Sequence, residues 1–278
     1  MLDFCYGIID LLLPFPWLGY NFMKNAFLAI LLVMPLFGLL GTMVVNNKMA
    51  FFSDSLGHGA FAGIAVGTLL GTANPLIGLV LFSVVFAIAI IFIKDKSKAA
   101  TDTVIGVFSS TAIALGIMMM SRGGSFNKYT GYLIGDLLSI KVSDLGVLIG
   151  VFIVIVTLWY FLFNKLLLIS VNTSLASSRG LAPLRIEICF AVALAIIVAV
   201  SIQWVGLLII NSMLVLPAAA ARNLAVNIRQ YHCYAVGIAL FSGIFGLMLS
   251  YYLNTATGAT IVIIAALIFF ITLFKNKC

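Results

Sequence analysis

Two ionisable side chains, Asp54 and His58, lie four residues apart at the start of a long apolar segment. In an α-helix this spacing puts both side chains on one face, where they could share a bound ion. His58 is one of 2 histidines in the chain. Ionisable groups at membrane depth are costly and call for a functional explanation. Because a carboxylate oxygen beside an imidazole suits a divalent transition metal, the pair predicts a metal site.

Both residues also have ordinary structural explanations. Asp54 follows Ser53 ahead of an apolar helix, a position where aspartate commonly caps the helix N-terminus. A single histidine near a helix end is often a satisfied structural residue. Two ligands are also fewer than a tight metal site needs, whereas a transport path needs only weak, transient ligation. Two copies of the chain facing each other across a symmetry axis would double the set.

The composition is that of a polytopic membrane protein. Hydrophobic residues make up 64% of the 278 residues and charged residues 8%, which is more apolar than a soluble core requires. The chain has no Walker-type nucleotide-binding motif, no HExxH and no Ser/His/Asp or paired-carboxylate arrangement, so we do not expect an enzyme. We attribute the net charge of +7 to cytoplasmic loops rather than to nucleic-acid binding.

Nine apolar segments are suitable as transmembrane helices, which need about 17–25 apolar residues. They predict an all-α polytopic fold with one membrane domain over residues 1–278, in which residues 1–20 form an interfacial segment rather than a span. If one candidate span is false, the count falls to eight. The predicted spans are 25–45, 52–72, 75–93, 104–121, 143–169, 185–203, 205–221, 234–252 and 258–274.

Positively charged residues predict the orientation in the membrane. Eleven of the 15 lysines and arginines fall on one side and four on the other, so the side with more positive charge, which includes the C-terminus, is predicted to be cytoplasmic.

His232 then lies in a basic cytoplasmic loop and is expected to be solvated. Glu187, beside Arg185, is expected to have a local partner or to anchor at the interface. The predicted cytoplasmic loops are 46–50, 94–103, 170–184 and 222–233.

A row of glycines begins directly after His58. Gly59, Gly63, Gly67 and Gly71 recur every four residues, and such a row lets another membrane helix approach closely. Helix packing by itself explains the row. The same packing would also hold the helix that carries Asp54 and His58 in place beside its neighbours.

A short helix with start and stop signals is predicted over residues 172–182. Asn172 is a suitable N-cap and Gly180 a suitable stop. The helix falls on the predicted cytoplasmic side. It is either an ordinary connection between two spans or a docking helix for a cytoplasmic partner.

Five segments in order resemble the permease subunit of bacterial ABC importers for zinc, manganese and related metal ions. The resemblance extends over residues 25–275, and the ordered set is more specific than any one motif. Asp54 and His58 belong to the first segment, and a V-G-x-L-L run followed by P-A-A-x-A forms the last. The segments are 54–65, 102–116, 132–136, 176–180 and 205–222.

The resemblance implies a type II-like importer permease in the bacterial cytoplasmic membrane. It implies a homodimer, an ATP-binding subunit that docks in the cytoplasm, and an extracytoplasmic metal-binding protein that delivers the ion. The transported substrate would be manganese, zinc or iron, with no permanently bound cofactor, and Asp54 and His58 would line its path. The residues implied to couple to the ATP-binding subunit are Leu175, Ala176, Ser177, Arg179 and Gly180.

The chain departs from the family pattern at several positions. Gly57 stands where a serine is usual, and Ala62 stands where a proline is usual, which removes an expected helix kink. Asn172 replaces an aspartate but keeps the capping ability. The alternative function is a stand-alone, ion-coupled secondary transporter in which Asp54 relays a proton or ion.

Overall fold

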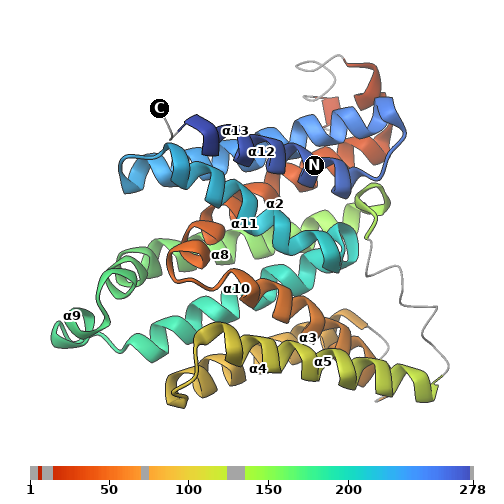
Figure 1. Ribbon diagram of the computed structural model, residues 1–278. Helices are drawn as coiled ribbons and strands as arrows, with labels where there is room; N and C mark the ends of the chain where they lie inside the picture. Colours follow the sequence, from red (N-terminus) through yellow and green to blue (C-terminus); the bar gives the residue numbers. More distant parts are fainter. Residues whose placement is uncertain (1–5, 8–14, 70–74, 124–134, 276–278) are drawn as a thin grey trace. The chain divides into compact units, whose positions relative to one another are not determined.

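The computed structural model describes residues 6–7, 15–69, 75–123 and 135–275. These residues contain nine long α-helices and no strand, and Figure 1 shows them in chain colours. The 3-10 turn η1 (Pro16–Gly19) precedes them, and the 3-10 turn η2 (Leu137–Ser139) and the short helix α9 (Thr173–Ser178) lie between them. The long helices are α2 (Asn21–Asn46), α3 (Ala50–Leu69), α4 (Pro75–Lys96), α5 (Thr101–Gly123), α8 (Val142–Val171), α10 (Pro183–Val205), α11 (Leu207–Leu224), α12 (Ile228–Leu253) and α13 (Thr257–Lys275).

Each of the nine predicted spans coincides with one of these helices to within a few residues, so the all-α polytopic fold is confirmed. In the described part of the chain, 7 helices are long and apolar enough to cross a membrane. The other two are α11, whose apolar stretch is short, and α3. Polar residues in its first turns set α3 apart, and they include Asp54 and His58.

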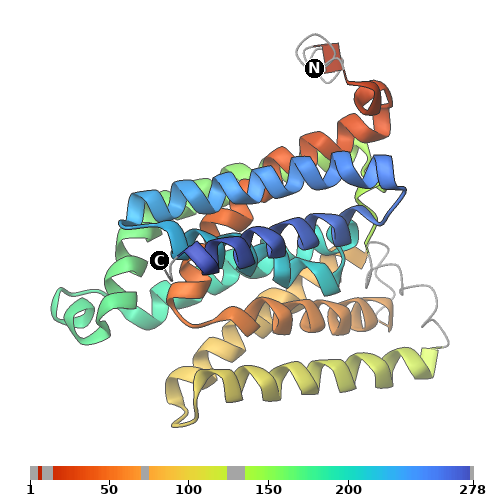
Figure 2. The same ribbon diagram turned by 45° about the horizontal axis from the view of Figure 1, so that its top comes forward.

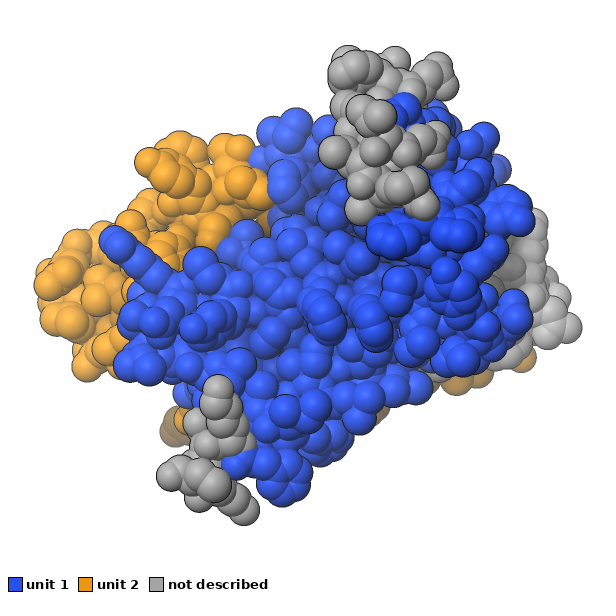
Figure 3. Space-filling model, turned by 90° about the horizontal axis from the view of Figure 1, so that it is seen from above, with its two compact units in different colours: residues 1–42, 135–153, 212–278 blue, residues 43–134, 154–211 orange. Residues whose placement is uncertain are grey.

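The chain forms two compact units, coloured separately in Figure 3. Unit 1 comprises residues 1–42, 135–153 and 212–278, and unit 2 comprises residues 43–134 and 154–211. Helices α2, α8 and α11 contribute residues to both units. The assignment of residues 1–278 to a single membrane domain, with 1–20 as an interfacial segment, stays a prediction.

Small residues bring the helices of unit 1 close together. A Cβ added at Gly41 of α2 would lie 2.1 Å from the carbonyl oxygen of Leu214 in α11, so only glycine fits there. A Cβ at Gly246 of α12 would lie 2.7 Å from the Cα of Ile261 in α13, and these two helices run side by side (Figures 1 and 2). Backbone-to-backbone contact of this kind is typical of membrane helix packing.

Unit 2 is built around α3, α4, α5 and α10. Helix α4 packs against both α3 and α10, and α5 packs against α3. Three of the six residues in their shared core are alanines, which lets these helices approach closely. The shared core consists of Ala60, Ile64, Ala65, Leu79, Ala199 and Ile202.

An ion pair links the end of α4 to the start of α10. Lys94 Nζ lies 2.8 Å from Glu187 Oε2, and each side chain is 21% exposed. Glu187 therefore does have a partner, but the partner comes from another helix rather than from Arg185.

Replacing Lys94 with alanine is expected to lower the free energy of unfolding by about 1–3 kcal/mol, because a partly buried carboxylate would lose its counterion. Thermal unfolding of the purified protein measures this loss. The double variant Lys94→Ala with Glu187→Gln should lose less than the sum of the losses in Lys94→Ala and Glu187→Gln measured singly. Lys98→Ala, at an exposed lysine just beyond the end of α4, is the control. Strictly additive losses would contradict a stabilising pair.

Candidate functional site

Helix α3 presents Asp54 and His58 together. His58 Nε2 lies 3.6 Å from Asp54 Oδ2, and their side chains are 24% and 38% exposed, respectively. This separation is too long for a hydrogen bond. It suits two donors of one ion, since ligand atoms about 2.1 Å from a metal lie roughly 3.0–3.6 Å apart for angles of about 90–120°. The pair can therefore contribute two adjacent positions of a coordination sphere.

The pair occupies the single open stripe on this part of α3. Between Phe52 and Ala60, every residue except Asp54 and His58 is buried. The neighbouring Ser53 is 0% exposed, and both the Ala50 carbonyl oxygen and Asn211 Oδ1 lie where they can accept the single hydrogen of its hydroxyl. Packing around the buried residues fixes the rotation of α3 about its axis. The open stripe therefore faces in one defined direction. The two polar side chains are the part of this segment that an ion can reach.

The glycine row of α3 lies against α4. A Cβ built at Gly59 would come within 2.6 Å of the Phe86 ring, and one built at Gly63 would come within 2.7 Å of Phe82 Cβ. Farther along, a Cβ at Gly78 of α4 would lie 3.0 Å from the Cα of Gly67. Gly71 is outside the described residues.

This glycine contact bears on the direction in which Asp54 and His58 point from α3. Gly59 follows His58 directly, so its face of α3 is turned by about 100° from that of the pair. Packing against α4 therefore leaves the Asp54/His58 stripe uncovered while holding the helix close to its neighbour.

The donor set within one chain is incomplete. Among the described residues, no cluster of three or more His, Cys, Asp or Glu side chains could hold a metal ion. A carboxylate and an imidazole fill only half of a four-coordinate sphere. One chain therefore offers two candidate donors, which fit weak ligation of an ion better than tight storage.

The segment predicted to couple to a partner folds as a short helix closed at both ends. The Asn172 side chain accepts a hydrogen bond from the Leu175 N–H at 3.0 Å. At the other end, Gly180 has φ +76°, Gly180 N–H donates to the Ser177 carbonyl and Leu181 N–H to the Ala176 carbonyl. These two bonds form a Schellman motif, which stops a helix firmly.

The predicted coupling residues differ in accessibility. Leu175 is 43% exposed, whereas Ala176, on the inner side of α9, is fully buried. Ser177, Arg179 and Gly180 are exposed. A partner that approaches this helix would meet the exposed residues, while Ala176 serves to seat the helix.

His232 is the residue whose environment was predicted wrongly. It lies in the first turns of α12 and is partly buried, not solvated. Its Nε2 is 3.0 Å from Thr42 Oγ1 on α2, and its Nδ1 is 2.7 Å from the Ile228 carbonyl oxygen. Tyr231 also reaches α2, since its hydroxyl donates to the Thr42 carbonyl at 3.4 Å. Polar residues at the start of α12 therefore tie two helices of unit 1 together.

The long apolar helices define a polytopic membrane protein. The model of the ABC 3 transport family matches residues 19–276, and the chain belongs to this family. The prediction of an ABC importer permease is thereby confirmed, and the stand-alone secondary transporter is not favoured.

Named relatives and a solved structure are similar over nearly the whole chain. The chain is 35% identical over 240 residues to the high-affinity zinc uptake system membrane protein ZnuB of Haemophilus influenzae, covering 86% of this chain and 91% of that protein. It is 29% identical over 259 residues to the manganese transport system membrane protein MntC of Listeria monocytogenes, with 93% and 92% covered. The structure of PsaBC from Streptococcus pneumoniae in complex with Fab matches with a TM-score of 0.80 and 27% identity, over 98% of this chain and 95% of that chain.

Proposed function

We propose that this chain is the permease subunit of an ATP-driven importer of a divalent transition metal, manganese, zinc or iron. The observation that carries the proposal is the Asp54/His58 pair on the open stripe of α3. The relatives named for zinc and manganese transport support the same class of substrate. A mixed oxygen and nitrogen donor set accepts all three metals, and affinity order alone does not select among them.

The working unit is a homodimer with the ion path on its two-fold axis. One chain supplies a carboxylate and an imidazole, so two copies facing each other supply four donors. Four donors shared between two chains can hold an ion in one arrangement and release it when the chains move apart. This property suits a transport path better than a preformed four-ligand cage does, because a tightly held ion would not leave.

Energy comes from a separate ATP-binding subunit that docks on α9. The permease itself performs no bond chemistry, and its sequence contains no nucleotide-binding motif. Helix α9 is capped at both ends, so a force applied to its exposed face passes to the adjoining helices rather than fraying it. An extracytoplasmic metal-binding protein delivers the ion to the other side of the membrane.

The test is metal uptake by the assembled transporter in proteoliposomes. Manganese and zinc should accumulate only when the permease, its ATP-binding subunit and ATP are all present, and competition between the metals identifies the preferred one. Uptake driven by a proton gradient, with the permease alone and no ATP, would contradict the proposal and restore the secondary-transporter alternative.

A further inference from the structure

An exposed aromatic ring lies at the start of the open stripe of α3. Phe51 is 60% exposed, whereas the next residue, Phe52, is 0% exposed. Phe51 precedes Asp54 by three residues and His58 by seven, so the three side chains follow the i, i+3, i+7 pattern of one helical face. With about 100° of rotation per residue, Phe51 lies about 60° around the axis from Asp54 and about 20° from His58. The ring therefore points in nearly the same direction as the Asp54/His58 pair.

That direction does not suit the hydrocarbon of the membrane. Asp54 and His58 lie inside the predicted span 52–72, and ionisable side chains within a membrane face protein or a water-filled cavity rather than lipid. Because Phe51 points the same way, its exposed ring faces the same space. The ring is thus an apolar side chain beside the proposed ion path.

Phe51 lies on the cytoplasmic side of the pair. Helix α3 begins at Ala50, at the end of the loop 46–50 that the positive residues predict to be cytoplasmic. The ring is about 4.5 Å nearer to that loop than Asp54 is, measured along the helix axis. An ion that leaves the pair toward the cytoplasm therefore passes Phe51 next.

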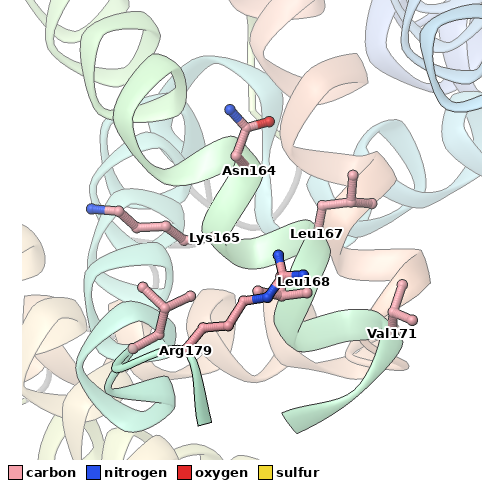
Figure 4. A pocket seen from close by; sticks show the side chains of 7 residues that line it. Asn164, Lys165, Leu167, Leu168, Val171 and Arg179 are labelled. Atoms are coloured by element: carbon pink, nitrogen blue, oxygen red, sulfur yellow. The ribbon is translucent and has the colours of Figure 1, made fainter. Parts of the chain in front are cut away.

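A hollow elsewhere in unit 2 is unsuited to a metal ion. It has a volume of about 440 Å³, lies between the end of α8 and the segment that follows α9, and is bordered by Lys165 and Arg179 (Figure 4). Two positive side chains repel a divalent cation, and Arg179 belongs to the surface proposed to meet the ATP-binding subunit. The stripe of α3, by contrast, combines a carboxylate, an imidazole and an apolar ring.

We propose that Phe51 is the cytoplasmic gate of the ion path, an inference that rests on the proposed homodimeric path through Asp54 and His58. Two copies of the chain that face each other bring their Phe51 rings together at the two-fold axis, next to the four donors. Rings in contact leave an apolar constriction, and constrictions of this kind close membrane pores by dewetting. When ATP-driven movement separates the copies, the rings part and the ion passes.

Packing between the two copies is the competing role for this ring. A residue that only packs contributes to the stability of the dimer and leaves ion passage unchanged. A gate residue controls ion passage in a dimer that is fully assembled, and the polarity of its side chain matters as much as its size. Leakage of ions and assembly of the dimer are therefore the two quantities to compare.

The experiment measures manganese entry without ATP hydrolysis into proteoliposomes that carry the assembled transporter and a metal-sensitive dye. Entry is followed without nucleotide and with a non-hydrolysable ATP analogue, so that both arrangements of the complex are sampled. Phe51→Ala should raise the rate of entry over the wild type by about ten-fold in at least one of them, which corresponds to a barrier lower by about 1.4 kcal/mol. Phe51→Leu should stay near the wild type, because leucine keeps the constriction apolar.

Two further variants control for the loss of a ring and for failed assembly. Phe161→Ala removes a ring that is 62% exposed but belongs to α8, and its rate of entry should equal that of the wild type. Phe51→Tyr keeps the ring and adds a hydroxyl that holds water in the constriction, so it should also leak. Size-exclusion profiles identify any variant that does not assemble, and Phe51→Tyr keeps the test informative if Phe51→Ala is one of them.

Two results would overturn the gate. One is manganese entry at the wild-type rate in both Phe51→Ala and Phe51→Tyr. The other is a Phe51→Ala dimer that dissociates while Phe51→Tyr still excludes manganese, which would favour packing. ATP-driven uptake by Asp54→Ala separates these failures from failure of the proposed function. If that uptake is lost while the Phe51 variants stay closed, only the gate is wrong, whereas normal uptake by Asp54→Ala removes the path and the gate together.

Discussion

Replacing Asp54 with alanine is expected to abolish metal accumulation while the permease still assembles with its partners. In a homodimer a single substitution removes two of the four proposed donors. Loss of a residue that merely supports a ligand already lowers metal affinity by about 10–100-fold, so loss of a direct ligand should exceed that range. His58→Ala should have the same effect, because each residue supplies half of the donors in one chain.

Two measurements distinguish loss of the ion-binding residues from loss of the assembled complex. Metal accumulation is measured in cells or proteoliposomes, and the amount of assembled complex is measured by co-purification of the ATP-binding subunit. Asp95→Asn is the matched control, since it removes a carboxylate charge at an exposed position at the end of α4. Undiminished uptake in both Asp54→Ala and His58→Ala would contradict the assignment of these residues to the ion path.

The second large effect is expected at Gly63, where α3 meets α4. An added Cβ would lie 2.7 Å from Phe82 Cβ and 3.2 Å from both the Gly78 carbonyl oxygen and the Leu79 Cα. Two of these three atoms belong to the backbone, so side-chain rotation cannot relieve the contact. Gly63→Ala should therefore destabilise the protein by about 1–3 kcal/mol through overpacking. Because α3 must shift, metal uptake should fall as well.

Gly146→Ala is the matched control for this change. Gly146 lies in α8, and a Cβ added there meets nothing within 4 Å. Alanine is also the better helix former by roughly 0.5–1 kcal/mol, so this variant should be as stable as the parent protein or more stable. Thermal unfolding of both variants measures the difference. If Gly63→Ala proved as stable as Gly146→Ala, close packing of α3 on α4 would not be what positions the Asp54/His58 helix.

The departures from the family pattern have a clear structural outcome on α3. Ala62 stands where a proline is usual, and α3 continues without a break from Ala50 to Leu69, as expected when the ring that would block a backbone hydrogen bond is absent. Ala62 is 1% exposed, and Gly57 is buried. The two replacements therefore lie inside the packed part of the helix rather than on the open stripe of Asp54 and His58.

The positions of the long helices could be predicted because the signals are local. A run of about 20 apolar residues is enough to identify a membrane helix wherever it lies. Capping is local too, and the Asn172 cap and the Gly180 stop act within a few residues of each other. The spacing of Asp54 and His58 likewise needs only the period of one helix. The order of several such segments was sufficient to identify the family.

What depends on contacts between distant segments could not be predicted in the same way. The sequence around His232 is basic and polar, which suggests that the side chain is exposed to solvent. Its Nε2 instead lies 3.0 Å from the Oγ1 of Thr42, a residue 190 positions away in the chain. Glu187 has Arg185 close by in sequence but pairs with Lys94 of another helix. A hydrogen bond or ion pair forms with whichever group packing brings near, and sequence distance carries no information about that.

The sequence by itself determined a polytopic helical permease of the metal-importer type, with a carboxylate and an imidazole on one helical face. Only the tertiary structure decided that this face is the open one. Residues 52–60 are buried everywhere except at Asp54 and His58, because α4 lies against the glycine row and other helices cover the rest of the segment. Periodicity can place two side chains together, but only packing decides which stripe of a helix stays accessible.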